Sequence, residues 1–220
     1  MKRFLLPALA VGFIASGPAR GGTVFTLPGS LNGKAGSSSA QMFTSDTGGY
    51  TMYATGYSST VDLKKDTLEL GKAVFLYGKH DGAGESGLGI NRVTDNEIGS
   101  KQTIEIDLSN FYSSRFGAVT LKIGSVQKNE GYALFGGASG PTDFLHAFVD
   151  TSGNNVVTTY EISQSEMLKE GGKLYLTADG GNVVLDSVTV ASVPEPGTIA
   201  LLLTGMTTVG LGWSRRRKVS

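Results

Sequence analysis

The sequence predicts an all-β fold, namely one antiparallel β-sandwich of the jelly-roll type. Glycine accounts for 32 of the 220 residues, about twice its usual share of roughly 7%, which favours strands joined by tight turns. Short apolar and β-branched runs recur between turn residues at sandwich-like spacing, and no long helical segments alternate with them. Once both ends are set aside, residues 23–192 remain, which is enough for one hydrophobic core.

The predicted strands are identified by apolar residues at every second position. Residues 23–49 begin with a strand and continue as loops. Thr103–Leu108 is the clearest strand, because its apolar residues alternate with Glu105 and Asp107, as expected when one face is buried. Val119–Ile123 repeats that alternation. The remaining strands are expected at Tyr50–Tyr57, Ala73–Tyr77, Tyr132–Phe135, Phe144–Val149, Val156–Ile162, Leu174–Ala178 and Val183–Val190.

Turn residues between the later strands predict two hairpins and one short helix. Residues 150–155 and 179–182 contain glycine, asparagine and aspartate, which tolerate positive φ, so each segment is expected to join two paired strands. Ser163 and Glu166 have the spacing of a capping box, which starts a helix. The glycine pair that begins at Gly171 is expected to end it.

Residues 1–22 have the layout of a secretory signal peptide. Lys2 and Arg3 precede an apolar run from Phe4 to Ile14, and small residues follow up to Ala19. The run is too short to span a bilayer, which needs about 20 apolar residues. We therefore expect the chain to pass through the secretion translocon and to be cut by signal peptidase, after Ala19 or two residues later.

The last segment, residues 193–220, contains three parts with separate physical roles. Residues 193–197 contain two prolines, which keep the backbone extended and accessible to a processing enzyme. Residues 198–213 are uncharged and apolar, and as a helix they extend roughly 24 Å at 1.5 Å per residue, which makes a short membrane helix. The tail, residues 214–220, is basic and by the positive-inside rule keeps the C-terminus in the cytoplasm. The topology-setting residues are Arg215, Arg216, Arg217 and Lys218.

These three parts together resemble the PEP-CTERM sorting signal, whose motif here consists of Val193, Pro194, Glu195, Pro196 and Gly197. The resemblance implies recognition by exosortase, a membrane protease-transpeptidase of Gram-negative bacteria that often make exopolysaccharide and biofilm. It also implies that the Pro-Glu-Pro residues are recognised and that the tail from Thr198 is cut off or left behind. The expected route is an inner-membrane intermediate facing the periplasm, followed by the outer surface or the extracellular space. The resemblance assigns this route but no molecular activity.

The chain has a formal net charge of zero, but its basic residues are concentrated at the two ends. Without Lys2, Arg3 and the C-terminal basic cluster, 13 basic residues face 19 acidic ones, a net charge of −6. Such an acidic domain repels phosphate backbones, so nucleic acid is not an expected partner. The chain has no cysteine, which excludes disulfides and thiol chemistry.

An acidic, glycine-rich segment from Asp81 to Ile98 is the candidate metal site. It resembles a G-L-G-V and N-E-I pattern seen in many PEP-CTERM proteins of unknown activity. The segment offers several of the oxygen ligands that Ca²⁺ prefers, and the alternative is a solvated loop whose glycines serve turns. No other cofactor is expected. The predicted calcium ligands are Asp81, Glu85, Asp95, Asn96 and Glu97.

The sequence does not favour an enzyme. A glycosidase needs two carboxylates that face each other across a sugar, and Glu105 and Asp107 instead share a strand face that commonly carries solubilising charges. His80 and His146 are the only histidines, which excludes a histidine-rich zinc site. The other nominal carboxylates are Glu85 and Glu97.

Carbohydrate binding is the main alternative function. The final strand, with Asp186, is similar to the closing strand of jelly-roll carbohydrate-binding modules. Exposed aromatic rings stack on sugars, although aromatics in strands are more often core residues. The leading hypothesis is a non-enzymatic envelope or extracellular-matrix protein, followed by a module that retains exopolysaccharide and then by a glycoside hydrolase. The aromatic candidates are Tyr50, Tyr53, Tyr57, Phe111 and Tyr112.

Overall fold

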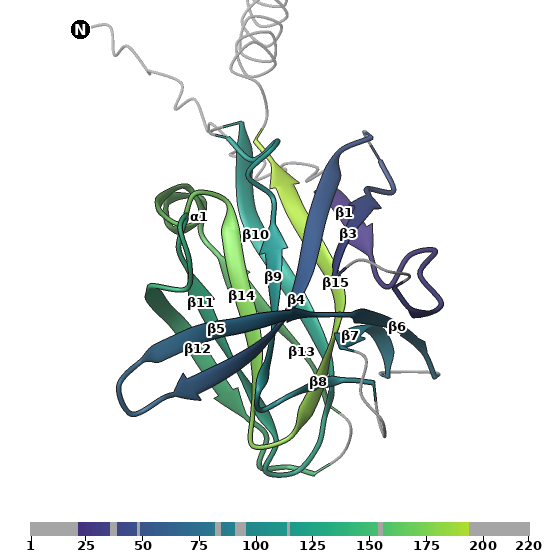
Figure 1. Cartoon of the computed structure of the whole chain (residues 1–220). Helices are drawn as coiled ribbons and strands as arrows, with labels where there is room; N and C mark the ends of the chain where they lie inside the picture. Colours follow the sequence, from purple (N-terminus) through teal and green to yellow (C-terminus); the bar gives the residue numbers. More distant parts are fainter. Residues whose placement is uncertain are drawn as a thin grey trace, which may run out of the picture.

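The structure is a computed structural model in which two antiparallel β-sheets pack face to face (Figure 1). The predicted all-β, sandwich-like fold is therefore confirmed. Residues 1–21, the apolar run at 198–213 and the basic tail lie outside the described part of the chain. Within the described part, no helix is long and apolar enough to cross a membrane. The described residues are 22–35, 39–47, 49–81, 85–90, 96–113, 115–153 and 156–193.

The first sheet is built around β15 (Asn182–Ser192). Along one edge β15 pairs with β10 (Phe116–Val126), which in turn pairs with β13 (Val156–Ile162). Along its other edge β15 pairs with three short strands in succession, and two further strands extend the sheet from the middle one. These five are β1 (Gly22–Thr26), β7 (Ser86–Ile90), β8 (Ile98–Gly99), β6 (Leu76–His80) and β2 (Gly33–Lys34).

The second sheet has the strand order β12-β11-β14-β9-β4-β3. One further strand, β5 (Thr67–Val74), pairs with the second half of β4. All of these pairings are antiparallel. The strands are β12 (Asp143–Val149), β11 (Gly131–Gly136), β14 (Lys173–Asp179), β9 (Gln102–Asp107), β4 (Thr51–Asp62) and β3 (Ala40–Thr44).

The core lies between the sheets and is formed by the alternation that the sequence shows. On β9, Ile104 and Ile106 are fully buried, and Leu108 just after the strand is buried with them. On β10, Val119, Leu121 and Ile123 are fully buried, while the residues between them are partly exposed. Each such side chain stabilises the fold by about 1.5–3 kcal/mol through burial.

The two predicted hairpins are wrong. Residues 150–155 lead from β12 in the second sheet to β13 in the first, and residues 179–182 lead from β14 to β15, which also lie in different sheets. The turn chemistry itself is present, since the Asp150 carboxylate accepts hydrogen bonds from the backbone N–H groups of Ser152 and Gly153 at 2.9 Å each. Turn residues reverse the chain in a hairpin and in a crossover alike, so they do not reveal which strand becomes the partner.

The predicted strand Ala73–Tyr77 is divided in the structure. β5 ends at Val74 and pairs within the second sheet, whereas β6 begins at Leu76 and pairs within the first. Phe75 is therefore the point at which the chain changes sheet. A continuous β-rich pattern in the sequence did not indicate this bend.

The β4–β5 hairpin covers part of the outer face of the second sheet. β5 crosses in front of β14 and β12 in Figure 1, and Leu68 on β5 packs in a second apolar cluster with Ala133, Phe135 and Tyr175. Tyr175 is only 2% exposed although it points away from the main core. The second sheet is thus apolar on both faces beneath the hairpin.

The short helix α1 (Gln164–Lys169) forms as predicted. The Ser163 side chain accepts a hydrogen bond from the backbone N–H of Glu166, and the Glu166 carboxylate accepts one from the Ser163 backbone. Gly171 and Gly172 adopt positive φ angles of 64° and 78° where the helix ends. The capping box and glycine stop are therefore confirmed.

Both ends of the described chain lie at the same end of the sandwich. Gly22, at the start of β1, pairs with Ala191 near the end of β15. β15 runs toward the top of the view in Figure 1, where it finishes at Ser192. The segments that precede and follow the domain are consequently attached within one strand spacing of each other.

Candidate functional site

The junction between the domain and the predicted sorting motif is tightly held. Ser192 pairs with Phe116 on β10, and the backbone N–H of Val193 donates a hydrogen bond to the Arg115 carbonyl at 3.1 Å. The Val193 side chain is 42% exposed. The rest of the motif, residues 194–197, lies outside the described residues. The described fold therefore ends one residue before the first proline of the motif.

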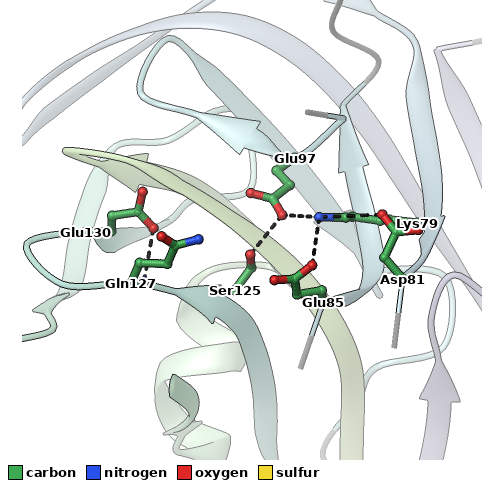
Figure 2. A network of polar contacts seen from close by, with 7 residues as sticks. All are labelled: Lys79, Asp81, Glu85, Glu97, Ser125, Gln127 and Glu130. Carbon is green, nitrogen blue, oxygen red and sulfur yellow. Dashed lines mark hydrogen bonds and ion pairs between the residues drawn. The ribbon is translucent and has the colours of Figure 1, made fainter. Parts of the chain in front are cut away.

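A buried lysine gathers three of the predicted calcium ligands around it (Figure 2). Lys79 on β6 forms a close ion pair with Glu97, which precedes β8, and both residues are less than 10% exposed. The Lys79 ammonium is also 3.6 Å from the Glu85 carboxylate and 3.8 Å from that of Asp81. Ser125 on β10 donates its hydroxyl to Glu97 at 2.8 Å. We call these five residues the Lys79 cluster.

The electrostatics of the cluster favour a charged lysine. Burial alone would lower the pKa of Lys79, but its hydrogen bond to Glu97 and the charges of Glu97, Glu85 and Asp81 outweigh burial and raise that pKa above its usual value. A buried charge is tolerated only when it is paired in this way. Lys79 thus offsets part of the charge of the three carboxylates, and the cluster links β6 and β10 with the residue that precedes β8.

Two glycines of the G-L-G-I segment are required by the packing of β7. A Cβ atom on Gly89 would lie 2.2 Å from the carbonyl oxygen of Asn96, and one on Gly87 would lie 2.7 Å from that of Leu185. Gly87 also has a φ of 158°, close to extended backbone. These glycines allow β7 to approach the backbone that carries Glu97 and the backbone of β15. Their role in the described structure is therefore close packing.

The predicted calcium site stays a prediction. Asp81, Glu85 and Glu97 do converge, but the cation they share is the ammonium of Lys79. Asn96 is adjacent in sequence and adopts a positive φ of 57°, while Asp95 lies outside the described residues. Among the residues that the structure describes, no group of three or more acidic, histidine or cysteine side chains is arranged to hold a metal ion.

A second charged group lies on the open outer face of the second sheet. Lys173 on β14 is 3.1 Å from Glu105 and 3.3 Å from Asp107, its neighbours on β9. Although burial lowers the pKa of Lys173, its bonds to both carboxylates raise it to about 12. Tyr53 and Tyr57 on β4 flank the same carboxylates, because Tyr53 pairs with Asp107 and Tyr57 with Thr103. Burial and the charge of Glu105 raise the pKa of Tyr57.

The aromatic sugar-binding candidates separate into two groups. Tyr53 is 43% exposed and Tyr57 is partly exposed, and both lie on the outer face of the second sheet. Tyr112 is buried, and its hydroxyl donates to the Gly117 carbonyl. Tyr50 and Phe111 stack on each other at the end of the sandwich where the chain termini lie, with ring centroids 5.2 Å apart. We call Tyr53, Tyr57, Glu105, Asp107 and Lys173 the outer-face strip.

The two histidines occupy structural positions. The His80 ring nitrogen Nε2 is 2.9 Å from the Leu31 carbonyl. His146 on β12 stacks on Tyr160 of β13 with ring centroids 4.1 Å apart, closing the edge between the two sheets. Burial lowers the pKa of His146.

Glu170 and Asp143 form a carboxyl pair with contrasting protonation tendencies. Glu170 is 1% exposed and its Oε1 atom has no hydrogen-bond partner. Burial and the nearby charge of Asp143 raise the pKa of Glu170, whereas the hydrogen bond from Lys169 lowers the pKa of Asp143. Because Glu170 is enclosed, a sugar has no access to it, and the pair does not meet the requirement of a glycosidase.

A described surface cleft lies elsewhere and has no acidic lining. It is located between β3 and the segment that follows β1, far from the Lys79 cluster in sequence. Its neutral lining offers neither a general acid nor a carboxylate nucleophile. The lining residues are Thr26, Gly29, Ser30, Leu31, Gln41, Met42, Phe43 and Thr44.

Comparison with known families identifies the C-terminal segment. The family model of the PEP-CTERM protein-sorting motif matches residues 192–218. The chain carries a PEP-CTERM sorting signal. This signal indicates export with membrane-associated processing by exosortase. The match begins at Ser192, the last residue of β15, so the PEP-CTERM signal follows the folded domain directly. No curated protein matches the chain.

Replacing Lys79 with methionine tests the role of the Lys79 cluster. Lys79→Met leaves the buried Glu97 without its cation, and we expect the free energy of unfolding at neutral pH to fall by about 3 kcal/mol. The double variant Lys79→Met with Glu97→Leu should recover most of this loss. The control Lys65→Met removes an exposed pair with Asp62 and should change stability little. Urea unfolding of the four proteins provides the comparison.

The wild-type protein also gives a pH signature for the Lys79 pair. Because the pKa of Lys79 is raised in the folded state, the contribution of the pair is complete below about pH 10.4 and is lost as the pH rises through the folded-state value. The stability gap between wild type and Lys79→Met, in which Glu97 has no cation at any pH, should therefore narrow in strongly alkaline solution. An unchanged or widening gap would contradict the assigned pairing.

Proposed function

We propose that the protein is an exported, non-enzymatic component of the bacterial envelope or extracellular matrix that exosortase processes at its PEP-CTERM signal. The observation that carries this proposal is the match of residues 192–218 to the sorting motif at the end of a folded β-sandwich. The proposed topology has the signal peptide removed and the domain on the periplasmic side. In it, residues 198–213 span the inner membrane and the basic tail from Arg215 remains in the cytoplasm. The domain is then released to the outer surface or the medium.

The non-enzymatic part of the proposal is supported by the state of the carboxylates. Glu85 and Glu97 are ion-paired with Lys79, and Glu105 and Asp107 are ion-paired with Lys173. A glycosidase requires one carboxylic acid with a raised pKa near an ionised partner, both open to the substrate. These paired carboxylates have the geometry of structural charges, which is why we place a hydrolase last.

The strand order supports a jelly-roll domain. In the first sheet the order is β7-β15-β10-β13, and in the second it is β9-β14-β11-β12. Apart from the step between β11 and β12, successive strands of this set alternate between the sheets, as two linked Greek keys do. Jelly rolls serve as capsid, lectin and enzyme scaffolds, so the topology fits a surface role without selecting an activity.

The sorting proposal is tested by the mass and location of the native protein. We expect the wild type to lose both terminal segments and to move beyond the inner membrane. A variant with Pro194, Glu195 and Pro196 all replaced by alanine should keep its C-terminal segment and stay in the inner membrane. The matched control instead replaces three exposed residues of the β4–β5 hairpin, Lys64, Lys65 and Glu69, with alanine, and should be processed like the wild type. Identical masses and identical fractions for wild type and the motif variant would show that the tail is only an anchor.

Retention of exopolysaccharide is the second candidate, and the outer-face strip is the observation that favours it. Exposed Tyr53 and partly exposed Tyr57 lie beside hydrogen-bonding charged groups on one open sheet surface, which is the combination used to bind sugar rings. The only cation of the outer-face strip, Lys173, is already paired with the two carboxylates of the strip. We therefore expect a neutral glycan to be a better ligand than an acidic one.

Glycan binding is tested by removing one aromatic ring from the strip. Tyr53→Ala should weaken binding to a responsive neutral polysaccharide by about tenfold, equivalent to about 1.4 kcal/mol. Tyr50→Ala is the matched control, because Tyr50 is similarly exposed but lies outside the strip. Binding is measured by affinity electrophoresis across a polysaccharide panel. Equal retention of both variants, or no retention of wild type by any polysaccharide, would rule the strip out as a glycan site.

A further inference from the structure

An aromatic group covers the end of the sandwich from which the sorting signal departs. Tyr50 stacks on Phe111 and meets Phe116 edge-on, with ring centroids 5.2 and 5.3 Å apart. Phe111 also contacts the fully buried Phe25, at 5.8 Å between ring centroids, so the group is anchored in the core. Tyr50 is 37% exposed. We call Tyr50, Phe111 and Phe116, together with Arg115 and Val193, the terminal patch.

The terminal patch is joined directly to the sorting signal. The Val193 backbone donates to the Arg115 carbonyl, and a Cβ atom on Gly117 would lie 3.7 Å from the Val193 side chain. Val193 is 42% exposed and Arg115 is exposed. An apolar residue, a tyrosine and an arginine thus lie together where the chain leaves the domain.

The length of the following chain limits how far this end can lie from a membrane. Only residues 194–197 separate Val193 from Thr198, the first residue of the apolar run. At 3.6 Å per residue the five Cα spacings cover at most about 18 Å. The headgroup layer on each side of the hydrocarbon core is roughly 5–8 Å thick. While the apolar run is in the bilayer, the terminal patch is therefore held at or near the lipid headgroups.

We propose that the terminal patch rests in the headgroup region of the membrane as long as the C-terminal segment is inserted. The inference rests on the proposed function, because it assumes that residues 198–213 span a bilayer. Tyrosine, with an apolar ring and a polar hydroxyl, suits the membrane interface, and Arg115 offers a cation to lipid phosphates. The short tether keeps the local concentration of lipid high, so weak individual contacts are sufficient. The occupant of the patch is a lipid surface.

This contact fixes the orientation of the domain. The termini end of the sandwich faces the bilayer, and the opposite end, with Val157 near the start of β13, points away. The outer-face strip remains accessible from the side. The Pro-Glu-Pro residues are then presented within the interfacial layer, where an integral membrane enzyme acts.

Fluorescence quenching by brominated lipids tests the proposal on the full chain in nanodiscs. In a Trp213→Phe background, which removes the single native tryptophan, Tyr50→Trp provides a reporter in the patch. The matched control is Val157→Trp. Val157 lies at the opposite end of the sandwich, and its side chain is 39% exposed. We expect the patch reporter to lose about half of its emission in brominated nanodiscs, as insertion to the headgroup and acyl boundary predicts, and the control to lose almost none. Val193→Trp serves as a second patch reporter if Tyr50→Trp does not fold.

The outcomes separate this inference from the proposed function. Co-elution of the chain with nanodiscs reports insertion of the C-terminal segment independently of quenching. Absence of co-elution overturns both insertion and this inference. Co-elution with equal or negligible quenching at the two positions overturns only the docking of the patch. Quenching that arises only when exosortase is present in the nanodisc also overturns it, because the partner is then a protein surface.

Discussion

β15 is paired along both of its edges, with β10 on one side and with β1, β7 and β8 in succession on the other. It is also the last strand of the described residues, so it fixes the point at which the sorting signal leaves the first sheet. The strand holds the N-terminal strand of the domain, supports the β7 segment with its two close-packed glycines, and delivers Val193 to the Arg115 carbonyl. The point at which the sorting signal begins therefore follows from the pairing of one strand.

Two lysines form ion pairs with acidic residues that lie in groups in the domain. Lys79 holds three carboxylates inside the first sheet, and Lys173 holds two on the outer face of the second. From the sequence alone, these carboxylates were candidates for a calcium site or for a pair of catalytic residues. In the structure each group contacts a lysine side chain of the protein. A lysine inside such a cluster costs desolvation that only several carboxylates offset. In the described structure these acidic residues contact a lysine of the same domain.

Local patterns in the sequence predicted the helix and most of the longer strands, because alternation and capping act over a few residues. They missed β7 and most of β5, and the prediction that residues 23–49 continue as loops was wrong for β3. Ile104 and Ile106 were predicted as core residues, and the Ser163 cap was recognised from its spacing to Glu166. Strand partners were not predictable, since the same turn residues at 150–155 serve a hairpin or a crossover. The Lys79 cluster joins residues from four separate segments, and nothing local distinguishes Lys79 from a surface lysine. The sequence identified the acidic residues of the cluster. It did not identify Lys79 as the cation they share, because that depends on tertiary contacts.

The central claim is that the folded domain extends to Val193 and joins the sorting signal without a flexible linker. Hydrogen exchange of the full chain in membranes tests it most directly. The account predicts that the backbone amides of Val190 and Val193 exchange slowly, since β15 is paired to its end and Val193 is bonded to Arg115. The exposed turn at residues 63–66 is the fast reference. Exchange at Val190 and Val193 as fast as in that turn would contradict the account, because the signal would then follow a flexible linker.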